Sequence, residues 1–360
     1  MIGSIILLIL LTGCGAKSQT QLEREKRMHN SKQYQDGKFK NPLDVPLMAP
    51  GSTWKYIKKS FFTKRIDPKP TGEIPLKPMR SKDWAEIDAD KLIFAWLGHS
   101  SILITMGGVT VLVDPVLEKR ASPFAWFGPK RFHPAPVSAE GLPPIDVVLI
   151  THDHYDHLEA STIKYLADKA GVFLVPLGIG GLLEKWGIAP DKVVELDWWE
   201  NHKVASLTLT ATPALHYARR GLFDGDKRLW CSWSIQGNNK KIFVSGDSGY
   251  FDGFKKIGRK LGPFDLTFLK IGSYDDMWKQ IHMTPEEAVQ QHQDLLGGAM
   301  VPLHWATFDL ALHPWYEPIE RALTAASKSE TRIITPTIGE LVNLNQVPDT
   351  SDWWRRVATP

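Results

Sequence analysis

The feature that most constrains how this chain can fold is a cluster of titratable side chains placed directly after an apolar run. The run IDVVLI at 145–150 leads into THDHYDHL, so that three histidines and two aspartates lie within six consecutive residues, 152–157. Burying polar groups is costly unless each one finds a partner. A solvated loop has no need for imidazoles at fixed intervals. Metal binding is the interpretation that requires this pattern.

Short apolar runs of β-rich composition recur along the chain and predict the strands of the fold. They lie at 92–97, 101–106, 109–114, 145–150, 172–176, 206–212, 241–246, 266–271, 299–303 and 332–335. Helical patterns fall between several of these runs, at 159–170, 252–261, 284–296 and 316–327. Many strands with interspersed helices are typical of a layered α/β protein whose sheets are covered by helices.

Four of the predicted strands are followed by side chains that commonly bind metals. The run at 145–150 is followed by His152, His154, Asp156 and His157. The run at 206–212 is followed by His216, the run at 241–246 by Asp247, and the run at 299–303 by His304. Loops at strand ends are where α/β sheets place their sites, because the sheet holds such loops rigid while their side chains converge. We therefore expect these seven side chains to meet at one edge of the fold.

The number and kind of these residues fit a centre of two metal ions. One ion would be held by His152, His154 and His216. The second would be held by Asp156, His157 and His304, with Asp247 bridging both. Neutral imidazole with carboxylate suits zinc best, and iron or manganese are alternatives. Two ions about 3.5–4 Å apart activate water and stabilise a leaving group, so hydrolysis at such a centre needs no Ser or Cys nucleophile.

The segments around these residues resemble a known family of metallohydrolases. The stretches WLGHSSILI at 96–104, VLVDPVL at 111–117, SGDSGYFDGFKKIG at 245–258 and VPLHWATFDLALHPWYEP at 301–318 carry the likeness. With them the chain resembles the metallo-β-lactamase fold superfamily and, within it, the family of phospholipases D that hydrolyse N-acylphosphatidylethanolamine. Together with DGKFKNP at 36–42, the resemblance covers roughly residues 30 to 325.

This resemblance implies a fold, a metal centre and a reaction. The fold would be an αββα sandwich of the metallo-β-lactamase type with the metals at one edge, preceded here by a basic N-terminal arm. The same seven residues would hold two zinc ions. The reaction would cleave a phosphodiester on the headgroup side of the lipid, releasing phosphatidic acid and an N-acylethanolamine.

Two residues are candidates for direct roles in catalysis. Asp247 would orient the attacking water and pass its proton towards the leaving alkoxide. His282, which precedes the helical pattern at 284–296, would reach a substrate phosphate, and the alternative is an ordinary packing histidine. We expect His99 to be structural, His133 and His313 to pack in loops, and His29, His202 and His292 to lie at the surface.

The loop at 122–134 is a candidate contact with a lipid surface. It contains four aromatic residues, among them Trp126, and the cations Lys130 and Arg131. Aromatic rings favour the membrane interface, where cations meet headgroup phosphates. The alternative is a folded loop that covers the sheet and buries its aromatic rings.

The start of the chain predicts export and attachment to a membrane. Seven consecutive apolar residues at 5–11 precede LTGC, which resembles a bacterial lipobox. Residues 1–13 would be a lipoprotein signal peptide and Cys14 the lipidated residue, although no Lys or Arg precedes the apolar run as is usual. The alternative is an apolar N-terminal tail. The lipoprotein interpretation places the protein in a bacterial cell envelope, facing the periplasm or the exterior.

Charge divides the chain into a basic arm and a mildly acidic body. Residues 15–80 hold 15 Lys and Arg against 6 Asp and Glu, whereas the rest of the chain is net negative. We expect an arm at 14–90 beside anionic lipid, a hydrolase domain at 91–345 and a C-terminal tail at 346–360. Nucleic acid is disfavoured as a partner because the body is acidic.

Two other functions compete with a lipid phosphodiesterase. The same metal centre would serve a metallo-lactonase or another hydrolase of a small envelope metabolite. Alternatively, an envelope lipoprotein would use zinc as a structural clamp without catalysis. Structural zinc sites are closed and four-coordinate, whereas seven candidate ligands for two ions leave room for water, which favours an enzyme.

Overall fold

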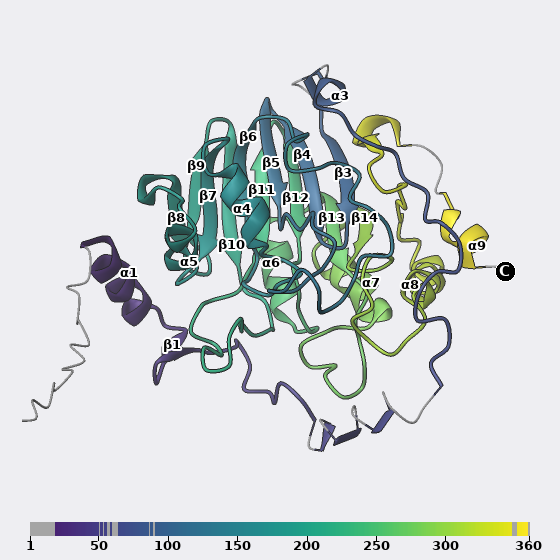
Figure 1. Cartoon of the computed structure of the whole chain (residues 1–360), viewed down its shortest axis with the longest axis horizontal. Coiled ribbons are helices and arrows are strands. Elements are labelled where there is room, and N and C mark those ends of the chain that lie inside the picture. Colours follow the sequence, from purple (N-terminus) through teal and green to yellow (C-terminus); the bar gives the residue numbers. More distant parts are fainter. Residues whose placement is uncertain are drawn as a thin grey trace, which may run out of the picture.

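The computed structural model describes residues 19–49, 51–52, 54–55, 58–59, 64–85, 87–88, 91–347 and 351–358 (Figure 1). The predicted signal peptide at 1–13 and the predicted lipidation residue Cys14 lie outside the described residues. Within the part of the chain that is described, none of the helices combines the length and the apolar character that crossing a bilayer requires.

Two sheets form the centre of the molecule. The seven-stranded sheet has the order β15 (Leu341–Asn343), β3 (Ile93–Gly98), β4 (Ser101–Met106), β5 (Val109–Val113), β6 (Ile145–Leu149), β7 (Ala170–Pro176) and β8 (Val193–Leu196). The six-stranded sheet has the order β14 (Gly297–Leu303), β13 (Phe264–Lys270), β12 (Lys240–Val244), β11 (Ser232–Gly237), β10 (Leu207–Thr212) and β9 (Asn201–Val204). A small hairpin of β1 (Tyr34–Gln35) and β2 (Lys38–Phe39) lies in the arm.

Each sheet combines an antiparallel part with a parallel part. Strands β3, β4 and β5 form an antiparallel meander, and β5 to β8 run parallel. Strands β9 to β12 are antiparallel, and β12 to β14 are parallel. In the parallel part of each sheet the carboxyl ends of neighbouring strands lie at the same edge. This arrangement brings the loops after β6, β12 and β14 into reach of one another.

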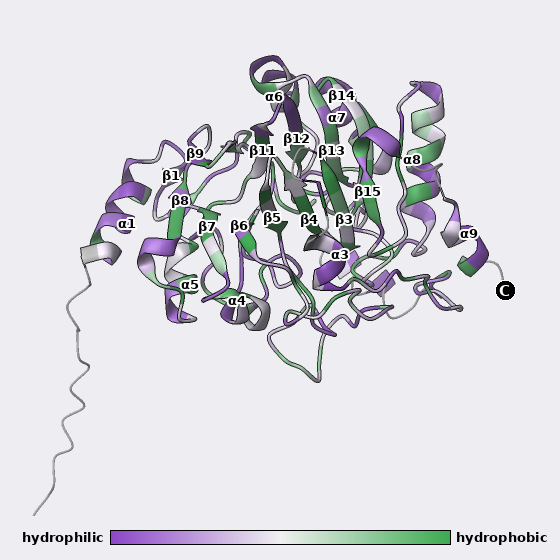
Figure 2. Ribbon diagram, turned by 90° about the horizontal axis from the view of Figure 1, so that it is seen from above, coloured by the Kyte–Doolittle hydropathy of each residue, from purple (hydrophilic) through white to green (hydrophobic). Residues whose placement is uncertain are grey.

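Helices cover the outer face of each sheet, as Figure 2 shows from above. Helices α4 (Ala160–Leu166) and α5 (Gly180–Lys185) pack on the seven-stranded sheet. Helices α6 (Gly253–Leu261), α7 (Pro285–Asp294) and α8 (Glu317–Lys328) flank the six-stranded sheet. The short helix α3 (Ser81–Ala85) precedes β3. The molecule is thus an αββα sandwich, which confirms the predicted fold class.

The alternation of side chains along β3 explains why both faces of a sheet are buried. Phe94 belongs to the core between the sheets, where its ring meets that of Phe268 edge to face at 5.1 Å. Ala95 and Leu97 point the other way, into the cluster beneath α4 and α5. Successive side chains of a strand lie on opposite faces, so a strand between two layers has to be apolar throughout.

The N-terminal arm docks on the body through helix α1 (Gln19–Asn30) and the β1–β2 hairpin. The guanidinium of Arg24 forms ion pairs with Glu184 and with the buried carboxylate of Glu195. Phe39, at the end of the hairpin, is 2% exposed and belongs to the main core. The described part of the arm is therefore packed on the body by a buried ion pair and a buried ring.

The C-terminal segment predicted as a tail, 346–360, contains helix α9 (Trp353–Ala358), which packs into the main core. Trp353 stacks on Trp305 at 5.3 Å, and Trp305 stacks in turn on Trp96 at 5.7 Å. Trp354 is fully buried. Three of the 14 tryptophans of the chain form this stack, and the middle one, Trp305, directly follows His304.

One predicted strand is wrong. The run at 332–335 forms an isolated bridge between Ile333 and Met300 instead of a strand. Two backbone hydrogen bonds join this run to β14, and Pro336 then ends the pairing because proline has no N–H to donate.

The tryptophan stack predicts a large contribution of α9 to stability. Replacing Trp353 by Ala should lower the free energy of unfolding by about 3–5 kcal/mol, because a large buried ring is removed and a cavity is left. The measurement is urea denaturation followed by circular dichroism. Trp126→Ala is the matched control, since this ring is 77% exposed and its loss should change stability by about 0.5 kcal/mol or less. Equal unfolding midpoints for the two variants would contradict the packing of α9.

Candidate metal centre

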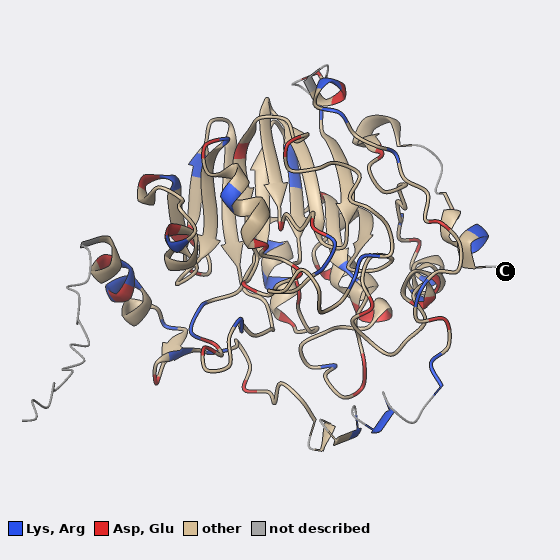
Figure 3. Ribbon diagram, viewed as in Figure 1, with Lys and Arg blue, Asp and Glu red and all other residues tan. Residues whose placement is uncertain are grey.

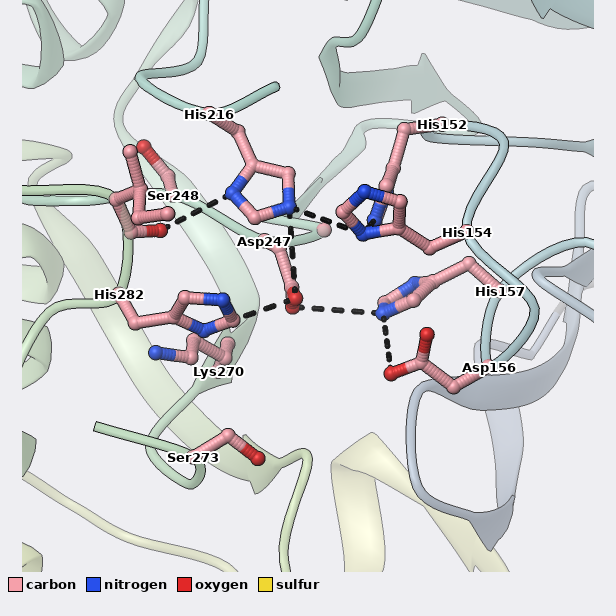
Figure 4. A network of polar contacts seen from close by, with 12 residues as sticks. His152, His154, Asp156, His157, His216, Asp247, Ser248, Lys270, Ser273 and His282 are labelled. Carbon is pink, nitrogen blue, oxygen red and sulfur yellow. Dashed lines mark hydrogen bonds and ion pairs between the residues drawn. The ribbon is translucent and has the colours of Figure 1, made fainter. Parts of the chain in front are cut away.

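Four strand ends bring the seven predicted ligands to one edge of the sandwich. The loop after β6 carries His152, His154, Asp156 and His157, and the loops after β10, β12 and β14 carry His216, Asp247 and His304. Figure 4 shows most of these side chains pointing towards a common centre. With His99 and His282 they form overlapping groups, and within each group the ligand atoms lie within 4.8 Å of one another. The convergence that the sequence predicts is therefore present.

Three imidazoles form the first half of the centre. His154 Nδ1 lies 3.0 Å from His152 Nε2 and 3.4 Å from His216 Nε2. The second nitrogen of two of these rings is held from behind: Thr151 Oγ1 lies 2.9 Å from His152 Nδ1, and the carbonyl of Ile281 lies 3.1 Å from His216 Nδ1. Each of these two rings is thereby fixed with its Nε2 facing the centre.

The second half of the centre is built around Asp156. Its Oδ2 lies 3.4 Å from His304 Nε2 and 3.7 Å from His157 Nε2. The ring of His99 also contacts this oxygen, at 2.9 Å. The ring of His99 groups with Asp156, His157 and His304, so it is a further side chain that could hold a cation. The carbonyl of His99 accepts the backbone N–H of His304 at 3.0 Å, and the expectation that His99 is structural stays a prediction.

Asp247 lies between the two halves. Its Oδ1 is 3.4 Å from His157 Nε2 and 3.2 Å from His304 Nε2. Its Oδ2 is 3.8 Å from His216 Nε2 and 3.8 Å from His282 Nδ1. One carboxylate oxygen thus faces each half, which is the placement expected of a bridging ligand.

Several buried atoms of this cluster form no hydrogen bond, and this fits a metal centre. Among the described residues, three such atoms face the centre: His157 Nε2, Asp247 Oδ1 and His304 Nε2. Buried polar atoms in native proteins almost always have a partner, and each exception needs an explanation. Imidazole nitrogens and carboxylate oxygens grouped in this way are the donors that zinc, iron and manganese accept. The residues present therefore fit one or two divalent cations.

The surroundings favour the protonation state of a metal ligand at His152, His216 and Asp247. Burial lowers the pKa of the His152 and His216 imidazoles well below the usual value, so both rings are neutral at neutral pH. Burial raises the pKa of the Asp247 carboxyl, but the imidazoles of His304 and His157 outweigh it and place this pKa well below its usual range. Metal binding requires neutral imidazole and ionised carboxylate. At His157 and His304 burial lowers the imidazole pKa, but the carboxylates of Asp247 and Asp156 outweigh it and raise this pKa, so these two rings would release a proton on binding a cation.

Sequence reasoning missed Asp114, which supports the centre from behind. Its carboxylate accepts hydrogen bonds from the backbone N–H and the hydroxyl of Thr151, at 2.8 and 2.6 Å, and lies 2.7 Å from His157 Nδ1. A carboxylate on the second nitrogen of a ligating histidine fixes its tautomer and its orientation. The signal in the sequence was the Asp that ends the apolar run at 109–114.

The backbone is strained at three residues of this region. His99, Asp114 and His304 have φ angles of 52°, 41° and 66°, although none of them is glycine. Such conformations are costly and persist where the surrounding structure over-determines them, which is common at functional sites. Each of these three residues directly follows a strand, which is β3, β5 or β14, and its left-handed backbone turns a polar side chain towards the centre.

A cleft of about 790 Å³ opens onto the centre. Its floor includes His154, Asp156, Asp247, His282 and His304. Its remaining lining is largely apolar and includes Leu47, Met48, Leu222, Phe223, Trp278, Ile281 and Leu310, with the cations Lys38 and Arg219. His282 is partly buried and lines this floor, and its contact with substrate stays a prediction.

Part of the loop at 122–134 is exposed, and its contact with a lipid surface stays a prediction. Trp126 is 77% exposed and Lys130 is exposed, so the alternative of buried aromatic rings does not hold for Trp126. Arg131 is a correction: it is buried and donates hydrogen bonds to the carbonyls of Val116 and Leu97, at 2.7 and 2.9 Å. Its guanidinium joins two strand ends and does not reach the surface.

The prediction that His292 lies at the surface is wrong. This residue is 3% exposed on the buried side of α7, and its Nδ1 lies 2.8 Å from Thr267 Oγ1. The expected helix was correct, but the face that it buries was not assigned from the sequence.

Comparison with known proteins identifies the family. The model of the beta-lactamase superfamily domain matches residues 109–305. An uncharacterized protein of Mycobacterium tuberculosis is 41% identical over 331 residues, which cover 90% of this chain and 88% of that protein. N-acyl-phosphatidylethanolamine-hydrolyzing phospholipase D 1 of Caenorhabditis elegans is 36% identical over 267 residues, covering 69% of this chain and 75% of that protein.

A solved structure supports the same fold. Igni18, a metallo hydrolase from the archaeon Ignicoccus hospitalis, matches with a TM-score of 0.55 at 21% identity, over 70% of this chain and 98% of that one. The family match covers the strand ends that carry all seven predicted ligands. This chain therefore belongs to the beta-lactamase superfamily and is a metal-dependent hydrolase of the metallo-β-lactamase fold.

Proposed function

We propose that this protein is a phospholipase D-type phosphodiesterase that cleaves N-acylphosphatidylethanolamine-like lipids to phosphatidic acid and N-acylethanolamine. The proposal rests on the cleft, which is lined by candidate metal ligands at its floor, by the side chains of Lys38 and Arg219, and by apolar side chains at its rim. The relative from Caenorhabditis elegans is named for this reaction, which supports the same chemistry here.

The apolar rim of the cleft supports a lipid substrate. Leu222 and Phe223 are 79% and 88% exposed, and they line the same cleft as Leu47 and Met48 of the arm. Exposed apolar groups gathered around a site commonly mark contact with a lipid, a membrane or another protein. Acyl chains of a lipid entering the cleft would cover these side chains. A small polar metabolite would leave them in water.

The cations of the cleft support an anionic group in the substrate. Lys38 and Arg219 line the cleft together with the ligands of the centre. A phosphodiester carries one negative charge, and charge-assisted hydrogen bonds to such groups are among the strongest in proteins. These two cations share the cleft with the Asp226 carboxylate, and together with the apolar rim they support a phospholipid rather than a neutral lactone.

The proposed mechanism assigns Asp247 and His282 to steps around the phosphorus. Divalent cations held by the seven ligands would lower the pKa of a water molecule and neutralise charge on the phosphate oxygens. Asp247 orients the attacking water and accepts its proton. The bond between phosphorus and the ethanolamine oxygen breaks, and Asp247 returns the proton to the leaving alkoxide. His282, whose Nδ1 lies 3.8 Å from Asp247 Oδ2, contacts a phosphate oxygen.

The cations are proposed to be two zinc ions, with iron or manganese as alternatives. Imidazole nitrogens outnumber carboxylate oxygens in the cluster, and this balance favours zinc.

The proposed location is the surface of a membrane in a bacterial cell envelope. The predicted signal peptide and the predicted lipidation of Cys14 would anchor the chain, and the basic arm would lie against anionic headgroups. Figure 3 shows Lys and Arg recurring along the described part of this arm. Trp126 and Lys130, both exposed, would contact the same surface.

The first test is a lipid digest with the zinc-loaded protein starting after Cys14. N-acylphosphatidylethanolamine in mixed micelles should yield phosphatidic acid and free N-acylethanolamine, identified by mass spectrometry. A chelator should abolish both products, and added zinc should restore them. If the lipid survives intact in protein shown to bind two zinc ions, the lipid assignment fails, and lactones and small phosphodiesters become the substrates to examine.

The apolar rim should matter for lipid aggregates and not for soluble esters. Replacing Leu222 and Phe223 together by Ser should raise the apparent KM for lipid vesicles at least tenfold, because the rim no longer buries apolar area against the lipid. Turnover of the soluble diester bis(p-nitrophenyl) phosphate should stay within about twofold. Leu22→Ser, an exposed apolar position on α1 outside the cleft, is the control. An equal loss on both substrates would show that the pair acts on the fold or on the chemistry instead.

The proposed role of Asp247 is tested with a matched pair of substitutions. Asp247→Asn should lower kcat by about 10²–10⁴-fold, the usual contribution of a positioned acid or base. Asp226→Asn, which removes another carboxylate from the same cleft, should change kcat less than threefold. Metal content measured by mass spectrometry separates loss of proton transfer from loss of metal. Unchanged turnover of the Asp247 variant would refute its role.

A further inference from the structure

The N-terminal arm reaches the metal centre through one side chain. Asn41 follows the β1–β2 hairpin and lies 175 positions before His216 in the chain. Its Oδ1 accepts the backbone N–H of His216 at 2.9 Å, and its Nδ2 donates to the backbone carbonyl of His216 at 2.7 Å. The acceptor and the donor of the Asn41 amide therefore both bind the backbone of His216, which is a predicted metal ligand.

His216 has little other backbone support within its own sheet. The β10 ladder ends at Thr212, so His216 lies in the loop beyond it. Its ring is oriented by the carbonyl of Ile281, which lies 3.1 Å from Nδ1. The backbone contacts of Asn41 and this ring contact together determine where His216 Nε2 points, which is towards His154 and Asp247.

Asn41 is itself held firmly in place. Phe39, two residues earlier, is buried in the main core and donates its backbone N–H to the carbonyl of Asp226 at 2.7 Å. The N–H of Lys40 donates to the carbonyl of Gln33 at 2.8 Å, which closes the hairpin. The residues just before Asn41 are thus fixed by backbone hydrogen bonds and by the buried ring of Phe39, which holds the Asn41 amide in position against His216.

We propose that Asn41 is a positioning residue of the metal centre, and that the arm is a working part of the active site. Asn41 acts through His216 and touches neither substrate nor metal. Groups that orient a metal ligand from behind typically change metal affinity or activity by about 10–100-fold when they are removed. The inference rests on the metal centre of the family and is independent of the lipid that we propose as substrate.

The chemistry of the amide predicts a graded series of variants. Ala at position 41 removes both hydrogen bonds to His216. Asp keeps an acceptor for the N–H of His216, but it sets a second carboxylate oxygen against the His216 carbonyl, which has no hydrogen to offer. Zinc affinity should therefore be highest in the native protein, lower in Asn41→Asp and lowest in Asn41→Ala.

The test measures metal binding directly. Zinc affinity is determined by competition with a chromophoric chelator, and the visible absorption of the cobalt-substituted protein reports the geometry of the ligands. Asn41→Ala should weaken zinc binding by about 10–100-fold and change the cobalt spectrum. Gln33→Ala is the matched control, because the Gln33 amide bonds Asp197 at 3.2 Å on the same arm but away from the centre. This control should keep its affinity within twofold and its spectrum unchanged.

Three results would overturn the proposal. The first is native zinc affinity and a native cobalt spectrum in Asn41→Ala. The second is an equal loss in Gln33→Ala, which would make the effect a general one of arm docking. If Asn41→Ala does not fold, Asn41→Asp decides, and native affinity in that variant is the third. None of these measurements uses a lipid, so failure of the lipid digest and failure of this proposal are distinguishable.

Discussion

The structure depends on one electrostatic constraint. Imidazoles and carboxylates are buried together at one edge of the sandwich, and a bound cation would satisfy the polar atoms that they leave without a hydrogen bond. The carboxylate of Asp247 faces four histidines within 3.8 Å, and several nitrogens of the cluster form no hydrogen bond among the described residues. The outward nitrogens of three ligands are held by neighbours: Thr151 holds that of His152, Asp114 that of His157, and the Ile281 carbonyl that of His216. The sheets, the strained strand ends and the supporting side chains all serve to keep the inward nitrogens free for a cation.

Catalysis and substrate choice are separated in this architecture. The sandwich supplies the candidate ligands through strand ends. The cleft above is built largely by segments outside the two large sheets, with Lys38 and Met48 from the arm and Leu222 and Phe223 from the loop after β10. Function resides in sites carried by a fold and not in the fold itself. The rim is therefore where a lipid hydrolase would differ from relatives with soluble substrates.

The sequence was sufficient to predict that the seven candidate ligands converge, because each of them follows an apolar run and the carboxyl ends of neighbouring strands meet at one edge. Asp114 carried the same signal and was overlooked, since a single Asp after a strand is common. Asn41, Arg131 and Trp353 carried no local signal. Their roles come from contacts with residues far away in the chain: His216, Leu97 and Trp305 respectively. Hydrophobic periodicity and motifs describe a segment by itself, so they cannot reveal which distant carbonyl or ring that segment will meet.

The tryptophan stack ties the metal centre to a helix that carries none of its candidate ligands. Trp305 immediately follows His304 and is sandwiched between Trp96 of β3 and Trp353 of α9. The backbone at His304 is therefore continuous with a packed column of three rings that come from three separate parts of the sequence. A change in the packing of α9 would be transmitted to the loop after β14, so the hydrophobic core and the geometry of the hydrolytic site are coupled through one side chain.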